Sequence, residues 1–188
     1  NLTRFDYDAG HRLVKQRFAT GLTFHYVYDD SGRCIETWGA YDDGQDTALH
    51  PDLFQTLSAL EASEMVHGDV APANVIVSEE GQPLLIDFGL TRAAGAEREG
   101  PSGKPGYVSI ESALGKPAAP ADDVYALGVV LAECLTGRRL FEESELAEAA
   151  ARRVELPRAV SEHAWLASML TLDPSQRPRA SELLSRVP

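Results

Sequence analysis

His67–Asn74, which reads HGDVAPAN, and Leu85–Gly89, which reads LIDFG, are the two stretches that decide the fold of this sequence. Between them lie two apolar runs, 75–77 and 84–86, and the polar residues 79–82 separate these runs. Two short apolar runs around a polar turn predict a tight β-hairpin. Because a hairpin folds the chain back on itself, it should bring Asp87 beside Asn74.

Asp69, Asn74 and Asp87 carry the oxygen atoms that phosphoryl transfer needs. The reaction requires a carboxylate that orients the attacking hydroxyl group, and hard oxygen ligands that hold Mg²⁺ against the phosphates of a nucleotide. Asp69 suits the first task, and Asn74 and Asp87 suit the second. The alternative is purely structural, with a turn residue, a cap and a helix start at these three positions.

In order and spacing, the two stretches resemble the eukaryotic-like protein kinases, whose catalytic loop reads H-R-D-x-x-x-x-N and whose metal-binding motif reads D-F-G. Three later stretches resemble further parts of that family: 106–111 (GYVSIE), 123–128 (DVYALG) and 173–178 (DPSQRP). The resemblance implies an α+β, protein-kinase-like fold. A reduced N-terminal β lobe is expected over residues 1–45, and a mainly helical C-lobe over residues 46–188.

The same resemblance implies two contacts that hold the C-lobe together. Arg177 is expected to form a buried, bidentate pair with Glu111, at the end of the activation segment. Asp123, at the start of a helix, is expected to accept backbone N–H groups of His67 and Gly68 in the catalytic loop.

Apolar periodicity and turn residues predict the elements of both lobes. Four β-like runs predict a meander: Thr3–Tyr7, Arg12–Phe18, Leu22–Tyr28 and Cys34–Trp38. Residues 38–43 would then form the hinge against which adenine packs. Helices are expected over residues 51–66, 122–136, 143–154, 160–171 and 175–186, with Gly137 capping the second of them.

Residues 1–50 lack the G-x-G-x-x-G loop that covers the phosphates in the family. Lys15 is the only lysine before the catalytic loop, and its surroundings resemble the V-A-I-K strand whose lysine contacts the phosphates. A surface lysine on an edge strand is the alternative. No glutamate lies between Lys15 and Glu36, so the helix that supplies the ionic partner of this lysine is expected to be absent or very short.

The catalytic loop also departs from the family pattern. Gly68 replaces the arginine that reads a phosphate group on the activation loop, so no phosphorylation switch of that kind is expected. Ala71 and Ala73 leave the loop without the cation that neutralises the transferring phosphate. Lys104 is the candidate for supplying this charge from the other side of the site, and a solvated loop lysine is the alternative.

The sequence therefore indicates a protein serine/threonine kinase that uses ATP and Mg²⁺ and acts on a protein substrate. Turnover would be weak if nothing replaces the lost charge, and an accessory or activating protein is a candidate partner that would complete the N-lobe. A pseudokinase or adaptor is one alternative. The other is a small-molecule kinase resembling the aminoglycoside phosphotransferases, which also carry His-Gly-Asp but do not need the Glu111, Asp123 and Arg177 contacts.

Composition and charge indicate which partners and which compartment suit the chain. A net charge of −12 disfavours binding to nucleic acid and to anionic membranes. Neither a leader pattern nor an apolar run near the roughly 18 residues of a membrane span is visible. Cys34 and Cys134 lack metal-ligand spacing. We therefore expect a soluble, cytoplasmic protein, and the bias toward alanine and arginine suits a GC-rich bacterial genome.

Overall fold

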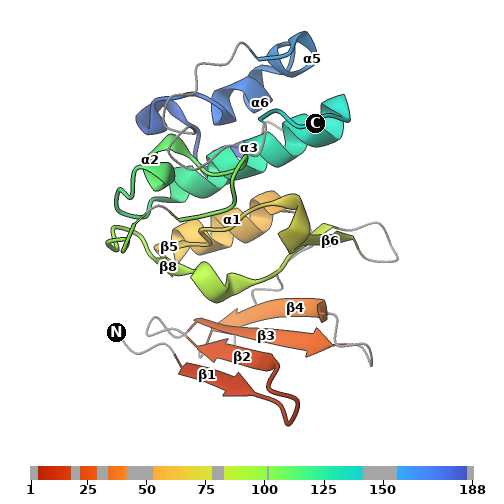
Figure 1. Cartoon of the computed structure of the whole chain (residues 1–188), viewed down its shortest axis with the longest axis vertical. Coiled ribbons are helices and arrows are strands. Elements are labelled where there is room, and N and C mark those ends of the chain that lie inside the picture. Colours follow the sequence, from red (N-terminus) through yellow and green to blue (C-terminus); the bar gives the residue numbers. More distant parts are fainter. Residues whose placement is uncertain are drawn as a thin grey trace.

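The computed structural model describes residues 4–17, 22–28, 34–41, 53–77, 83–100, 102–141 and 156–185. Figure 1 shows a four-stranded sheet at one end of the molecule and a mainly helical part stacked on it. The strands come first in the chain, and most helices follow. The organisation is therefore α+β with small sheets and a mostly helical later part, as the sequence predicts.

The first sheet is an antiparallel meander in the order β1-β2-β3-β4. Its strands are β1 Arg4–Tyr7, β2 Leu13–Arg17, β3 Leu22–Tyr28 and β4 Cys34–Tyr41. All four predicted strands are confirmed, and β4 continues three residues beyond Trp38. Strand β4 lies nearest the helical part and contacts β7, Pro83–Leu85, there (Figure 1).

The turn between β1 and β2 is organised by Asp8. One of its carboxylate oxygens accepts the backbone N–H groups of Gly10, at 2.8 Å, and Arg12, at 2.9 Å. The Arg12 side chain donates to the other oxygen at 2.7 Å. Hydrogen bonds from Arg12 lower the pKa of Asp8, so this carboxylate is ionised under ordinary conditions.

Two small β-ladders frame the catalytic loop. Strand β6, Val75–Val77, pairs with β7, Pro83–Leu85, and this confirms the predicted hairpin. Strand β5, Met65–Val66, pairs with β8, Arg92–Ala93. The turn of the hairpin lies outside the described residues.

Helix α1, Leu53–Ala62, delivers the chain into that loop, but it is shorter than predicted. Glu64 adopts a left-handed backbone with φ 54°, which ends the helix, and Met65 then enters β5. Apolar periodicity that continues through Met65 predicts a helix to residue 66. Met65 is buried, as that pattern requires, but it lies in a strand.

Helix α3, Pro120–Thr136, is the central helix, and residues 122–130 are buried on every side. Pro120 occupies its first turn, so the helix begins two residues before the predicted start. Gly137 ends it in the left-handed conformation with φ 64°, as expected. A Cβ on Gly128 would lie 3.0 Å from Met169 Cβ, so glycine permits a close approach of helix α6, Ala164–Met169.

The last predicted helices are broken into shorter pieces. Residues 160–171 form parts of α5, Arg158–Ser161, and α6, Ala164–Met169, because His163 between them has an extended backbone. The predicted helix 175–186 is likewise wrong in its start: a 3₁₀ turn, η3, covers Pro174–Gln176, and α7 covers only Ala180–Leu183. The predicted helix 143–154 lies outside the described residues.

Arg177 joins the end of the chain to α2, Ile110–Ala113, and to the start of α3. Its buried guanidinium donates to the carboxylate of Glu111 at 3.0 Å. The predicted pair is confirmed, but it is not bidentate: the other donations reach the carbonyl oxygens of Thr171, Ala121 and Leu172. Arg177 also packs over the ring of Tyr125, 4.8 Å from its centroid.

Arg177→Met should lower the free energy of unfolding by about 3 to 5 kcal/mol, because it leaves a half-buried carboxylate and three carbonyl groups without their donor. Glu111→Gln keeps an oxygen acceptor and should cost about 1 kcal/mol. Urea denaturation measures both changes. Arg158→Met is the control, because its partner Glu162 and Arg158 itself are exposed. Equal losses for all three variants would contradict the structural role of Arg177.

Candidate active site

The catalytic loop begins at His67, directly after β5, and its first two peptide groups are held by Asp123 on α3. The N–H of His67 donates to one carboxylate oxygen of Asp123 at 2.6 Å, and the N–H of Gly68 donates to the other at 2.9 Å. This confirms the contact that the sequence predicts. Both N–H groups are 55 or more residues away from Asp123 in the chain, so the bond fixes the tertiary position of the loop.

Asp123 is buried, and burial raises the pKa of its carboxyl group to about 7. The two donated N–H groups and Arg98 act in the opposite direction, and the neighbouring carboxylate of Asp122 raises the pKa further. Desolvation dominates because a carboxylate enclosed in the core loses its hydration.

The His67 ring connects the two motifs through contacts that the sequence does not predict. Its Nε2 lies 3.2 Å from the carbonyl oxygen of Ile86, and its Nδ1 accepts the N–H of Asp69 at 3.3 Å. The ring meets that of Phe88 edge to face, with 4.7 Å between centroids. These roles assign a neutral imidazole with its proton on Nε2. Burial lowers the pKa of His67 to about 4.

Asp69 and Asn74 are brought together by a 3₁₀ turn, η1 Pro72–Asn74, at the end of the loop. The Asn74 amide nitrogen donates to the backbone oxygen of Asp69 at 2.7 Å and to its carboxylate Oδ2 at 2.8 Å. Asn74 is buried, and Asp69 is half-buried. This arrangement leaves Asp69 Oδ1 and Asn74 Oδ1 without a hydrogen bond to any described residue, so one oxygen of each remains for a ligand.

Asp87 follows the hairpin, and the N–H of Ile86 donates to the carbonyl oxygen of Asn74 at 2.8 Å. The hairpin therefore returns the chain to Asn74, as predicted. Asp87 is exposed and adopts a left-handed backbone with φ 63°. It begins a 3₁₀ turn, η2 Phe88–Leu90, and its Oδ1 accepts the N–H of Gly89 at 3.2 Å. A Cβ on Gly89 would lie 3.1 Å from that oxygen, so glycine suits this position.

The donor set fits magnesium. Asn74 and Asp87 each offer a hard oxygen, and Mg²⁺ in nucleotide sites is held by one or two protein groups together with phosphate oxygens and water. Phe88, between Asp87 and Gly89, is fully buried, and this burial anchors the exposed Asp87 at the surface of the helical part.

Lys104 and Asp69 line the same small hollow, together with Gly68 and Gly103. Gly103 has φ +117°, and its Cβ position lies 3.6 Å from the carbonyl oxygen of Gly68, so this segment runs close to the catalytic loop. The backbone oxygen of Lys104 accepts the N–H groups of Tyr107 and Val108, both at 3.1 Å. Its ammonium group forms no ion pair or hydrogen bond with the residues that the structure describes.

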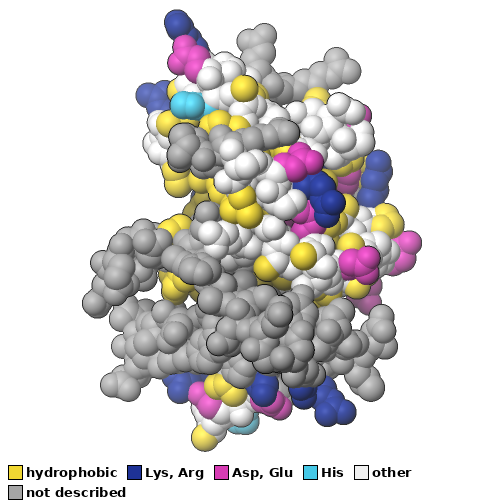
Figure 2. All heavy atoms as spheres, turned by 180° about the vertical axis from the view of Figure 1, so that it is seen from behind, with side chains coloured by type: hydrophobic (Ala, Val, Ile, Leu, Met, Phe, Trp, Pro, Cys, Tyr) yellow, Lys and Arg dark blue, Asp and Glu magenta, His cyan; other side chains and the backbone are white. Residues whose placement is uncertain are grey.

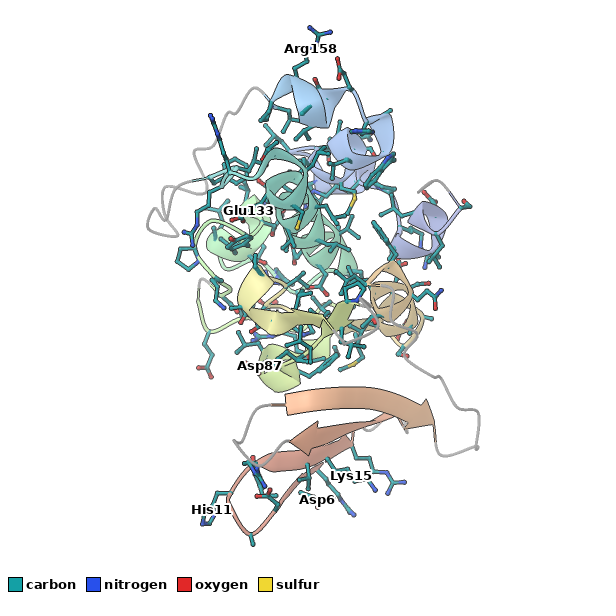
Figure 3. The ribbon with its side chains drawn as sticks, turned by 90° about the vertical axis from the view of Figure 1, so that its right-hand side faces the viewer. Asp6, His11, Lys15, Asp87, Glu133 and Arg158 are labelled. Carbon is teal, nitrogen blue, oxygen red and sulfur yellow. The ribbon has the colours of Figure 1, made fainter. Side chains whose placement is uncertain are left out.

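Lys15 lies apart from these residues. It stands on β2, between Asp6 on β1 and His25 on β3 in the strand register. Strands β3 and β4 therefore separate it from the helical part, and Figure 3 shows Lys15 low on the sheet while Asp87 faces the sheet from above. Its contact with phosphates stays a prediction.

The surface of the described residues carries charges of both signs. On the face in Figure 2, acidic, basic and apolar side chains alternate over the helical part.

Among the described residues, no helix combines the length and apolar character needed to cross a bilayer.

The lowered pKa of His67 makes the free energy of unfolding depend on pH. A variant that lacks this ring shows how large that dependence is. Because this pKa is lowered in the folded protein, the His67 ring of the unfolded chain binds a proton at a higher pH than the ring of the folded chain does. The free energy of unfolding therefore decreases as pH falls from about 6.5 toward 4. His67→Phe removes this loss. The stability deficit of His67→Phe relative to the parent should shrink by about 2 to 3 kcal/mol between pH 7 and pH 4.5.

Denaturant titration of both proteins at the two pH values measures this difference. His163→Phe is the matched control, since His163 is exposed. A deficit for His67→Phe that stays constant with pH would show that the folded protein accepts the proton on this ring.

Comparison with known proteins agrees with the geometry. The protein kinase domain matches residues 15–187 of the chain. The serine/threonine-protein kinase PkaA of Streptomyces coelicolor is 34% identical over 148 residues, which are 72% of this chain and 27% of that protein. PknA of Mycobacterium tuberculosis, also a serine/threonine-protein kinase, is 35% identical over 107 residues, which are 55% of this chain and 25% of PknA.

A probable serine/threonine-protein kinase of Dictyostelium discoideum, mkcD, is 31% identical over 145 residues, which are 71% of this chain and 22% of that protein. The matched part thus spans about a quarter of the length of these relatives. The resemblance seen in the sequence is confirmed: the chain belongs to the protein kinase domain family.

Proposed function

We propose that this chain transfers the γ-phosphoryl group of ATP to a serine or threonine hydroxyl of a protein substrate. The observation that carries the proposal is the bonded pair of Asp69 and Asn74, at 2.8 Å, which the hairpin joins to Asp87. Phosphoryl transfer relies on positioning and charge stabilisation more than on covalent chemistry by the protein. A rigidly held carboxylate beside two oxygen ligands meets that need.

Each residue of the group has a distinct task. Asp69 Oδ1 accepts the hydrogen bond of the substrate hydroxyl and orients it toward the phosphate, while Oδ2 stays fixed by Asn74. Asn74 and Asp87 hold Mg²⁺ through their side-chain oxygens. When bound, Mg²⁺ neutralises charge on the phosphate oxygens.

Lys104 supplies the cation that Ala71 cannot. Ala71 is fully buried and uncharged, whereas Lys104 lines the same hollow as Asp69. A cation held where charge develops on the transferring group stabilises the transition state. The lack of an ion-pair partner for Lys104 among the described residues supports this role, because its charge remains available for a phosphate group.

The N-terminal part completes the proposal. Residues 1–45 form a reduced N-lobe and residues 46–188 form the C-lobe, with residues 38–43 as the hinge for adenine. Between Lys15 and α1, the residues that the structure describes lie in strands, and the helix that pairs this lysine in the family is expected to be absent or very short. Lys15 steadies the phosphates once an accessory protein, or residues outside this chain, complete the lobe.

A pseudokinase or adaptor is the second candidate. Its specific support is the position of Lys15, since strands β3 and β4 separate it from Asp87 and the helical part. The preserved geometry of Asp69 and Asn74 favours the enzyme. A small-molecule kinase is the weakest alternative, because the chain keeps the Arg177 to Glu111 contact that ends a protein kinase activation segment.

Transfer of labelled phosphate from ATP and Mg²⁺ to a generic basic protein tests the roles. Asp69→Asn should lower turnover by about 10²- to 10⁴-fold, because the hydroxyl loses its orienting carboxylate. Asp87→Asn should weaken Mg²⁺-dependent nucleotide binding, measured by titration with a fluorescent ATP analogue. Lys104→Met should lower turnover by about 10²-fold.

Lys116→Met is the matched control for Lys104→Met, because it removes the same charge from an exposed side chain. It should leave turnover unchanged. If Lys104→Met behaves like Lys116→Met while Asp69→Asn loses turnover, the role of Lys104 fails. Transfer by the parent protein no greater than by Asp87→Asn would favour the pseudokinase.

A further inference from the structure

We propose that three residues, Arg98, Asp122 and Ser109, form a clamp that keeps the activation segment, residues 87–111, ordered without a phosphate group. The inference rests on the proposed function, because the clamp serves the same site. Its members are positioning residues: none of them touches the reacting atoms.

The centre of the clamp is a buried ion pair. Arg98 lies in the middle of the activation segment and donates to Asp122 Oδ2 at 2.7 Å. Only 2% of the Arg98 side chain and 4% of the Asp122 side chain are exposed. A second donation from Arg98 reaches the carbonyl oxygen of Lys116 at 2.9 Å. The guanidinium is thus held by the chain that leads into α3.

Asp122 connects this pair to the end of the activation segment. Its Oδ1 accepts the hydroxyl group of Ser109 at 2.6 Å, and its Oδ2 also accepts the N–H of Ala119 at 3.0 Å. Ser109 Oγ in turn accepts the N–H of Ser112 and caps α2. One carboxylate therefore binds the middle of the segment, the end of the segment and the start of α3 at once.

Backbone hydrogen bonds run beside the clamp. Gly95 N–H donates to the carbonyl oxygen of Ala118 at 2.7 Å, and Ala118 N–H donates to that of Ala96 at 2.9 Å. Ala94 N–H donates to the carbonyl oxygen of Glu64 at 2.7 Å. The first half of the segment is therefore attached to fixed chain just before Arg98, so Arg98 reaches Asp122 from a constrained backbone.

The stretch around Arg98 and the catalytic loop lack two parts of a phosphate-based alternative. Residues 92–101 contain no serine, threonine or tyrosine, so this stretch has no hydroxyl group to modify. Gly68 stands at the phosphate-reading position with φ +82°, and a Cβ there would lie 3.2 Å from the carbonyl oxygen of Leu90. An arginine at position 68 would be strained and crowded. The buried pair supplies, from within the chain, the charge contact that ordering requires.

The clamp reaches the site through the hollow beside the catalytic loop. Asp122 and Ser109 line this hollow together with Asp69 and Lys104. If the clamp opens, Lys104 and Gly103 lose the surface that holds them near Gly68. The clamp therefore acts on binding of the protein substrate and on the position of Lys104, and it should leave ATP binding unchanged.

The test measures order of the segment directly, by limited digestion with a glutamate-specific protease. Glu97 and Glu99 flank Arg98, are exposed and remain in every variant. After phosphatase treatment, the parent protein should resist cleavage at these residues. Asp122→Asn and Arg98→Met should each be cleaved at least tenfold faster, because each leaves one buried charge without its partner. Arg98→Lys should recover part of the resistance.

Arg179→Met is the control variant, because it breaks the ion pair between Arg179 and Glu61, which lies outside the clamp. It should be cleaved at the parent rate. Should the single clamp variants not fold, the double variant Arg98→Met with Asp122→Leu removes both charges and should fold. It should still be cleaved faster than the parent protein, because the bonds to Ser109 and Lys116 are lost with the pair.

Kinetics provide the second readout. The Michaelis constant for the protein substrate should rise about tenfold in Ser109→Ala and Asp122→Asn, with that for ATP unchanged. Cleavage of Asp122→Asn at the parent rate would overturn the clamp, and so would cleavage of the parent protein that speeds up after phosphatase treatment. If the parent transfers no phosphate but clamp variants are cleaved faster, the clamp is supported and the proposed function fails.

Discussion

The acceptance of two backbone N–H groups by one buried carboxylate, that of Asp123, is the constraint on which the rest of the site depends. It fixes His67 and Gly68 to the central helix α3 at 2.6 and 2.9 Å. From this fixed start the loop places Asp69, and the bond from Asn74 then sets the carboxylate. The side chains of Asp69 and Asn74 are thus positioned from a helix whose residues 122–130 are all buried, and the proposed phosphoryl transfer requires such a fixed arrangement.

Sequence patterns correctly predicted the elements whose turns and ends are set by residues close to them in the chain. The hairpin β6-β7 follows from two apolar runs and a polar turn, and the end of α3 follows from Gly137. Predictions failed where one residue broke a longer pattern. Glu64 ends α1 by a left-handed backbone, and His163 divides the helix expected over residues 160–171. Apolar periodicity reports burial, and it cannot distinguish a buried strand from the last turn of a helix.

The candidate site likewise contains residues whose proximity the sequence predicts and residues whose position it does not predict. The proximity of Asp69, Asn74 and Asp87 was predictable, because their separation in the sequence is short and a hairpin is enough to bring them together. The lysines depend on contacts between distant segments: Lys104 shares a hollow with Asp69, whereas Lys15 lies two strands away from β4. The role of the His67 ring could not be predicted either, since it depends on the orientation of a buried side chain toward Ile86.

The buried anchor of the catalytic loop has a further consequence for the exchange of protons on unfolding. In the folded chain, burial lowers the pKa of His67 to about 4 and raises the pKa of Asp123 to about 7, so at pH 5.5 both groups are mainly neutral. Unfolding at this pH lets His67 take up about one proton and Asp123 release about one. The two changes cancel in the proton count. This pair therefore makes almost no contribution to acid sensitivity in moderately acidic solution, although each member alone would contribute strongly.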